Sequence, residues 1–573
     1  MIRLKDKLKH IYIFLLILLF VFMVEAIADD IISQYNLPPL QRDTNYSPTD
    51  SILKKAKVLK YAGDMPVKYT EVMDTGRFIS DLKTSIRKQI ETIGHGYNTV
   101  YFKGKTAHEL NRFIDGLTAE SKVEIVLTES EIQLDETINL RSYTIIKGCS
   151  TRFISKGIDI AILGKDIRSV WLKGFIIDGP KVCGIMFINA KKCIVDNIEV
   201  LNSHDRGMVI RRNSSFIYVT HSRFKENKRG GIMLQDVSNH VYIMHCDISG
   251  GRNSSNWSAG VVFSSVPAIT EYGIRDIFDS NYFYPKEFYF KKDKVPFKNI
   301  VEASYIHDNQ SSGIYVDGGN GNVVVGNYIA SNDKEGICLD FYSMGNIVES
   351  NSIAGNGFRR YQSDDDLKHD AVLHFGRLAD GSAVSKLPNI SLDNAAYNLI
   401  IRNTISGAAG DGVKIVRSGF RNIIGLNSIT DNNKNENNVF YFSGVLLGSA
   451  GSDYENDTSG IDALPSIENI VFGNTIYGQH KIGILIDRGS ISNDIFNNVI
   501  HKQKDAYIIQ HSHPNSVIGN NFNVEKVGFK ERLFSSKKTV VLSLIILLLI
   551  SVGLNIFFIE RFLKSRKNNR LSG

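Results

Sequence analysis

Two short segments of the chain end on an aspartate in the same frame, GIYVD at Asp317 and GICLD at Asp340. The segment KHDAVLHF at 368–375 matches KEGICLDF at 334–341 in its first Lys, its Leu and its final Phe. It carries His374 where the other segment carries Asp340. If these segments are successive rungs of one stack of strands, Asp317, Asp340 and His374 form a column of ionisable side chains. Strand alternation turns Tyr315 to the same outer side.

Neighbouring rungs lie about 4.8 Å apart, so stacked Asp317 and Asp340 would repel each other at neutral pH. A raised pKa on one carboxyl, calcium held by both, or the charged form of His374 would relieve that repulsion. A sheet surface without function would not normally align like charges. The column is therefore the predicted site, with Lys414 and Arg417 on the following rung.

The elements that would position this column follow from a repeat that runs from about residue 158 to 522. A small or polar residue, any residue and then Ile recur about 24 residues apart where no insertion intervenes. The clearest cases begin at Asn327, Asn351, Asn403, Asn427, Asn474 and Asn498. A second strand, led by Gly in most rungs, follows about nine or ten residues later. This pattern predicts a parallel β-coil with Ile and Val in the bore and a structural stack of asparagines at a bend.

With these rungs the chain resembles the right-handed parallel β-helix superfamily, the pectate-lyase-like proteins, over roughly residues 160–522. The resemblance implies an all-β, right-handed parallel β-helix. It implies an activity less directly, because such helices occur in polysaccharide lyases, uronan C5-epimerases, polygalacturonases, tailspike glycosidases and non-catalytic proteins.

Three functions fit this reading. The first is a lyase or C5-epimerase on an acidic, uronate-containing polysaccharide, with His374 as base or acid and Tyr315 as proton donor. Lys414 and Arg417 would then neutralise the sugar carboxylate, while Asp317 and Asp340 would orient the base or hold calcium. The second is a glycosidase that uses the two aspartates as its carboxylate pair. The third is a binding or assembly β-helix in which the column is only a solvated stripe.

Insertions favour a cleft beside the column. They are expected at 265–298, 357–368 and 376–396, and the first is rich in aromatic rings and lysines, which suit a sugar polymer with carboxylates. The segment SHDR at 203–206 resembles part of the mannuronan epimerase motif Asp-Pro-His-Asp but lacks its first Asp and its Pro. His204 and Arg211 are therefore only outer candidates.

Composition excludes some classes of function. The 573 residues are 43% hydrophobic and 22% charged, with a net charge of +7 and no basic block interleaved with aromatics, which argues against nucleic acid as a partner. Five scattered cysteines do not form a disulfide framework or a zinc site, and at most one bridge is expected.

The two ends predict a location. Residues 1–28 have the charged start, apolar run and small residues of a signal peptide, and 539–559 is apolar and long enough to span a bilayer. Between them we expect a leader and cap at 29–120, the parallel β-helix at 121–523 and a basic linker at 524–538, with a cytoplasmic basic tail at 560–573. The protein would then be a single-pass protein of the cytoplasmic membrane with the β-helix on the periplasmic side. Exopolysaccharide export machinery is a predicted partner.

Overall fold

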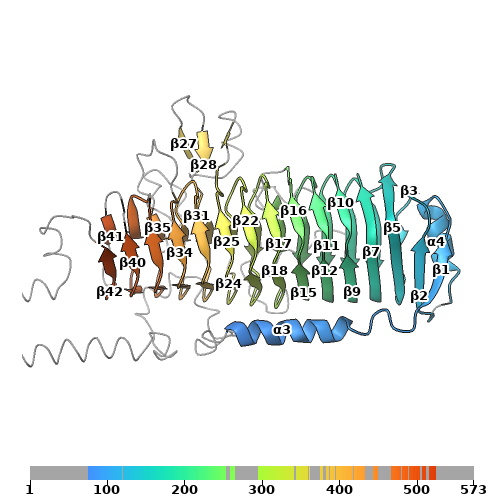
Figure 1. Cartoon of the computed structure of the whole chain (residues 1–573), viewed down its shortest axis with the longest axis horizontal. Helices are drawn as coiled ribbons and strands as arrows, with labels where there is room; N and C mark the ends of the chain where they lie inside the picture. Colours follow the sequence, from blue (N-terminus) through green and yellow to red (C-terminus); the bar gives the residue numbers. More distant parts are fainter. Residues whose placement is uncertain are drawn as a thin grey trace, which may run out of the picture. The chain divides into compact units, whose positions relative to one another are not determined.

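The computed structural model describes residues 75–523, apart from gaps at 119, 253–257, 265–294, 341–342, 359, 362–374, 378–382, 386, 394, 417–418, 433–442, 449–465, 479, 488–489, 502, 504–505 and 511–514. These residues form a right-handed coil of short parallel strands, stacked rung on rung along one axis (Figure 1). The predicted parallel β-helix is confirmed. The end segments 1–28 and 539–559 lie outside the described residues, and no helix within 75–523 is long and apolar enough to cross a membrane.

Each turn contributes strands to three faces. The first face pairs, in spatial order, β1 (Asn98–Phe102), β2 (Val123–Leu127), β5 (Thr144–Ser155), β7 (Arg168–Asp178), β9 (Lys191–Asp196), β12 (Ser215–Thr220), β15 (Asn239–Met244), β18 (Ile300–Glu302), β21 (Val323–Val325), β24 (Ile347–Glu349), β30 (Leu399–Ile401), β33 (Ile423–Gly425), β36 (Ile470–Phe472), β39 (Asp494–Phe496) and β42 (Ser516–Ile518). The long strands β5 and β7 continue into the second face and join the two faces into one hydrogen-bonded sheet.

The second face adds to these β3 (Glu131–Leu134), β10 (Glu199–Leu201), β13 (Arg223–Lys225), β16 (Asp247–Ser249), β19 (Tyr305–His307), β22 (Tyr328–Ala330), β25 (Ser352–Ala354), β31 (Thr404–Ser406), β34 (Ser428–Thr430), β37 (Thr475–Tyr477), β40 (Val499–His501) and β43 (Asn521–Asn523). The third face, a separate sheet of 13 strands, is made of β4 (Ile138–Asn139), β6 (Ile160–Lys165), β8 (Cys183–Ile188), β11 (Arg206–Arg211), β14 (Ile232–Gln235), β17 (Val261–Ser264), β20 (Ile314–Asp317), β23 (Ile337–Asp340), β29 (Ile390–Asp393), β32 (Val413–Val416), β35 (Ser443–Leu447), β38 (Ile482–Ile486) and β41 (Ala506–Gln510).

The bore is filled by one continuous core, mainly of Ile, Val, Leu and Phe, contributed by alternate residues of the stacked strands. The asparagines at the bend between the first and second faces form a ladder, as the repeat predicts. Asn427, for example, donates from Nδ2 to Oδ1 of Asn474 at 2.9 Å and accepts at Oδ1 from the Nδ2 of Asn403 at 3.0 Å. Each amide therefore satisfies buried polar groups of the adjacent rung.

The match between 368–375 and the rung at 334–341 is wrong. The strand that follows β23 in the third face is β29, in the register Leu339↔Leu392. The intervening chain instead forms a small antiparallel sheet of β26 (Arg360–Tyr361), β28 (Ala383–Ser385) and β27 (Phe375–Arg377), which stands off the stack (Figure 1). Residues 362–374 lie outside the described residues, and Phe375 begins β27 of this small sheet, so the segment is not the rung after β23.

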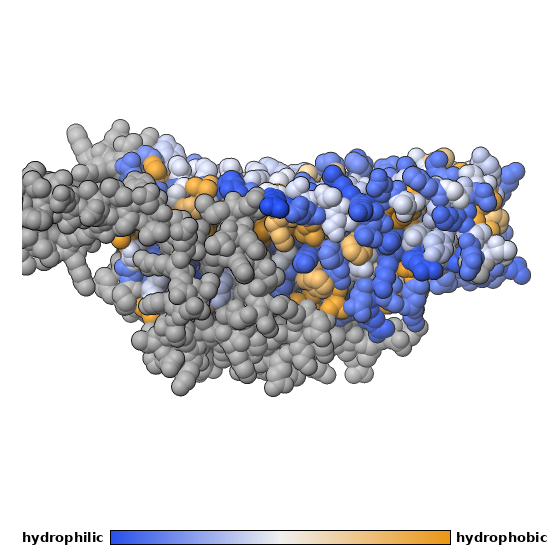
Figure 2. Space-filling model, turned by 90° about the horizontal axis from the view of Figure 1, so that it is seen from below, coloured by the Kyte–Doolittle hydropathy of each residue, from blue (hydrophilic) through white to orange (hydrophobic). Residues whose placement is uncertain are grey.

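Two helices lie near the start of the described residues, α3 (Thr75–Ile90) before β1 and α4 (Ala107–Asp115) between β1 and β2. The predicted capping box is present, since Glu109 and Thr106 cap each other at the start of α4. The helix α3, which the sequence reading missed, packs Ile79, Leu82 and Ile86 against apolar residues of the first face (Figure 1). Seen from below, the described surface is mostly hydrophilic, with hydrophobic residues between (Figure 2). All five cysteines are free, and only Cys149 is exposed.

Candidate active site

A column of three aspartates runs across the third face. Asp317 on β20 is in register with Asp340 on β23. Because Leu339 is in register with Leu392, Asp340 is followed on the next rung by Asp393 of β29. We call Asp317, Asp340 and Asp393 the carboxylate column.

Asp393 was missed in the sequence, although the signal for it is there. The three strands read IYVD, ICLD and ISLD, so each has Ile, any residue, an aliphatic residue and then Asp. The third copy lies within the predicted insertion at 376–396, which therefore contains a rung of the third face, β29. His374 and Arg417 lie outside the described residues, and the rung that was to place His374 in the column does not exist at that position.

The aromatic ring of Tyr315 lies outside the bore. Ile314 and Val316 belong to the core of the bore, whereas Tyr315 belongs to a separate apolar cluster that includes Val262 and Cys338. Tyr315 and Asp317 are nevertheless fully buried. Of the column, only Asp340 and Asp393 are partly exposed, so these two carboxyls are the ones that a ligand can reach.

Asp317 is the buried end of the column. Neither of its carboxyl oxygens has a hydrogen-bond partner among the described residues. Burial, and after it the negative charge of Asp340, raise the pKa of Asp317 well above its usual value. Both effects favour the protonated form of Asp317, and with Asp317 protonated the column carries less negative charge than three ionised aspartates would give it.

Tyr315 fixes the orientation of Asp340. Its hydroxyl donates to Oδ2 of Asp340 at 2.9 Å. Burial and the neighbouring carboxylates raise the pKa of Tyr315 well above its usual value, so the phenol keeps its proton. A fully buried phenol that donates to Asp340 is placed to hold that carboxylate, not to deliver a proton to a ligand.

A second outward column lies directly beside the first. Cys338 on β23 is in register with Ser391 on β29, which is in register with Lys414 on β32. Burial, and the charges of Glu335, Asp340 and Asp393, raise the pKa of the Cys338 thiol well above its usual value. Lys414, with 9% of its surface exposed, lies one rung beyond Asp393 and gives this end of the site a cation.

The described residues contain no group of three or more His, Cys, Asp or Glu that could hold a metal ion. The outer candidates are separate from the site, because Arg211 stands three rungs before Asp317 and forms an ion pair with Asp236 at 4.0 Å. The neighbouring Arg206 is buried and donates to the carbonyl of Arg229 at 2.6 Å, which is a structural contact.

The family described as "Right handed beta helix region" matches residues 125–284 and 277–452, which together make up more than half of the chain. The family described as "Periplasmic copper-binding protein (NosD)" matches residues 443–545. No curated protein matches the sequence.

Solved structures resemble the chain at low sequence identity. The A-module of a mannuronan C-5 epimerase, AlgE4 of Azotobacter vinelandii, shares 13% identity at a TM-score of 0.45, over 75% of this chain and 99% of that one. A DFA-IIIase of Arthrobacter chlorophenolicus A6 shares 13% identity at a TM-score of 0.43, over 75% of this chain and 100% of that one. The Dettilon tailspike protein shares 11% identity at a TM-score of 0.42, over 72% of this chain and 68% of that one. Similarity at this level says nothing about activity.

Proposed function

We propose that this chain, which belongs to the right-handed β-helix family, is an extracytoplasmic enzyme that acts on a polysaccharide at its carboxylate column. The observation that carries the proposal is the column itself. Two partly exposed carboxyls, Asp340 and Asp393, stand on consecutive rungs and are backed by the fully buried Asp317. Stacked like charges are costly in a sheet, and function is the usual reason for perturbed acids to be held together.

The reaction that this pair supports best is hydrolysis of a glycosidic bond. Consecutive rungs lie about 4.8 Å apart, which is close to the separation of about 5–5.5 Å between the carboxyls of retaining glycosidases. The hydroxyl of Tyr315 stabilises negative charge on Asp340, so Asp340 is the nucleophile and Asp393 the general acid.

In the first step Asp340 attacks the anomeric carbon while Asp393 gives its proton to the departing glycosidic oxygen, and the carbon–oxygen bond breaks. In the second step Asp393 takes a proton from water, whose oxygen displaces Asp340 from the sugar. Asp317 stays protonated throughout and keeps a third negative charge away from the pair.

Removal of the proton α to a uronate carboxylate, by a lyase or a C5-epimerase, is the second candidate. Lys414 favours it, because a cation one rung beyond Asp393 is placed to neutralise the carboxylate of an acidic sugar. Tyr315 does not act as the proton donor in this reaction, because its side chain is fully buried and cannot contact the sugar. Calcium at Asp317 and Asp340 belongs to this candidate only, because bound calcium would require Asp317 to ionise.

The match to a periplasmic protein family supports an extracytoplasmic location for the β-helix. Anchoring of the chain in the cytoplasmic membrane through 539–559 and cooperation with exopolysaccharide export are part of the same proposal. An enzyme held at that surface would meet its polymer as it leaves the cell.

The test is to incubate the full-length protein in detergent with neutral and uronate polysaccharides. New reducing ends without near-ultraviolet absorbance indicate hydrolysis, unsaturated ends indicate a lyase, and altered composition without cleavage indicates an epimerase. Asp340→Asn and Asp393→Asn should abolish the reaction. The matched control is Asp487→Asn, because Asp487 follows β38 at the equivalent position, three rungs beyond Asp393. Full activity of the Asp340 and Asp393 variants would refute the enzyme proposal and leave a binding or assembly protein.

A further inference from the structure

The second face carries an isolated pair of exposed aromatic rings. Tyr305 of β19 is in register with Tyr328 of β22, and their ring centroids are 5.2 Å apart with 49° between the ring planes. The residues are 42% and 48% exposed. On the next rungs the same position holds small hydroxyl residues, Ser352, Thr404 and Ser428. The rung geometry therefore does not require a ring at this position.

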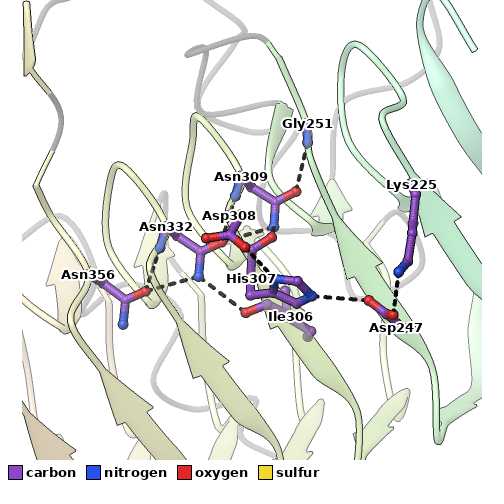
Figure 3. Close-up of polar contacts among 9 residues, drawn as sticks. All are labelled: Lys225, Asp247, Gly251, Ile306, His307, Asp308, Asn309, Asn332 and Asn356. Atoms are coloured by element: carbon purple, nitrogen blue, oxygen red, sulfur yellow. Dashed lines mark hydrogen bonds and ion pairs between the residues drawn. The ribbon is translucent and has the colours of Figure 1, made fainter. Parts of the chain in front are cut away.

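The first of these rings is held in place by a histidine of the same strand. The imidazole of His307, on the same strand, stacks on Tyr305 with centroids 3.7 Å apart and 16° between the planes. His307 is itself fixed at both nitrogens, with Nε2 3.1 Å from Oδ1 of Asp247 and Nδ1 2.6 Å from Oδ2 of Asp308 (Figure 3). Asp247 also pairs with Lys225 at 2.8 Å. An aromatic surface that is ordered in advance loses little entropy when a ligand covers it.

We propose that Tyr305 and Tyr328 form a stacking platform for two consecutive pyranose rings of a polysaccharide chain. Sugar rings have apolar C–H faces that pack on aromatic rings, and their rims carry hydroxyls that hydrogen-bond to carboxylates. Asp308, whose side chain is 64% exposed, is positioned beside the platform to accept such bonds.

The geometry and the charge of the platform limit which polysaccharides it can bind. The two rings stand on consecutive rungs, so the sugar chain runs along the axis of the β-helix, and the 5.2 Å between ring centroids is comparable to the length of one pyranose unit. Lys225 is paired with Asp247, and the two nitrogens of His307 face Asp247 and Asp308, so the described contacts of this cluster hold no positive charge without a carboxylate beside it. The platform therefore fits neutral sugar residues and not a polyanion.

This platform is a site of its own. It stands on the second face, whereas the carboxylate column stands on the third, and its binding does not depend on any reaction at Asp340 and Asp393. A polymer bound at the platform therefore stays attached to the protein whether or not a reaction takes place at the carboxylate column.

The test measures binding of the full-length protein in detergent to konjac glucomannan, hydroxyethyl cellulose and dextran, with alginate and polygalacturonate for comparison, by affinity electrophoresis and calorimetry. At least one neutral polymer should bind. Tyr305→Ala with Tyr328→Ala should weaken that binding about tenfold or more, with the stacking of a nucleobase on one aromatic ring as the scale. The double Phe variant should bind as the wild type does, and added salt should change little, because stacking is not screened.

The matched control is Tyr477→Ala, which removes a 39% exposed tyrosine from β37 of the same face. Three results would overturn the platform: no neutral polymer binds, the control weakens binding equally, or the double Ala variant changes only the oligomeric state. The Asp340→Asn variant separates this proposal from the enzymatic one. Normal glycan binding with lost activity in that variant supports both, while unaltered binding in the double Ala variant removes the platform alone.

Discussion

Replacing His480 by asparagine tests how this β-helix depends on a neutral imidazole. A second ladder of side chains runs through Asn389 and Asn432 to His480, where an imidazole takes the place of the next amide. Nε2 of His480 accepts from Nδ2 of Asn432 at 3.1 Å and lies 3.3 Å from its backbone N. His480 is fully buried, and an imidazolium has no lone pair to accept these bonds.

Burial lowers the pKa of His480 from 6.5 to about 4. Between pH 6.5 and pH 4 the unfolded chain therefore binds more protons at His480 than the folded protein does. The stability that the neutral imidazole contributes is lost as the pH falls from about 6.5 to 4. A lowering of the pKa from 6.5 to about 4 is worth about 3 kcal/mol, at roughly 1.4 kcal/mol per pKa unit. At pH 5, about 2 kcal/mol of this is already lost.

The His480→Asn variant restores an amide that does not titrate. Melting temperatures of the wild type and the variant should therefore fall by different amounts between pH 7 and pH 5, with the larger fall in the wild type. Hydrogen exchange in β34 and β37, corrected for intrinsic rates, should show the same difference locally, because a repeat protein opens in parts. The control is His501→Asn on β40. Equal losses in wild type and His480→Asn would refute the reasoning.

Three further predictions concern the carboxylate column. Asp317→Asn imitates the protonated acid and should raise the melting temperature at pH 7, because a carboxyl whose pKa is raised on folding destabilises the protein as the pH rises. A lower melting temperature would contradict this. Tyr315→Phe removes the hydrogen bond to Asp340 and should lower kcat about 100-fold with KM little changed, which steady-state kinetics will show. Lys414→Met should raise KM for uronate polymers and leave neutral ones unaffected if a cation there recognises the sugar carboxylate, and an equal effect on both would exclude that role.

The stack could be predicted from the sequence because each rung repeats the same local rule. Asparagine at the bend and Ile in the bore recur at a nearly constant spacing, and the hydrogen bonds of Asn327, Asn351 and Asn403 follow the predicted order. What this rule does not fix is the length of chain between rungs. Because the spacing is unknown, the sequence does not show which segment follows β23. The three matching residues at 368–375 indicated the wrong segment, and the true rung at Ile390–Asp393, with its third carboxyl, was missed.

The burial of Asp317 and Tyr315 could not be predicted for a different reason. Alternation along a strand shows which side chains leave the bore, but not what covers them outside it. In the same way, the amphipathic pattern of α3 does not indicate which face of the coil receives it, since that depends on Ile79, Leu82 and Ile86 meeting an apolar stripe built from many rungs.

The asparagine ladder has a consequence for how such a protein changes over time. Asn327 and Asn351 are 24 positions apart, whereas Asn351 and Asn403 are 52 apart, yet the Nδ2–Oδ1 bond between the side chains is 3.0 Å in both pairs. The 28 additional residues between the second pair do not change the length of the hydrogen bond between the asparagines. Loops at these points can be exchanged or lengthened, because the entropic cost of closing a loop grows slowly with its length and the stacked rungs stay in register. New specificities can thus be grafted beside a fixed column of carboxyls.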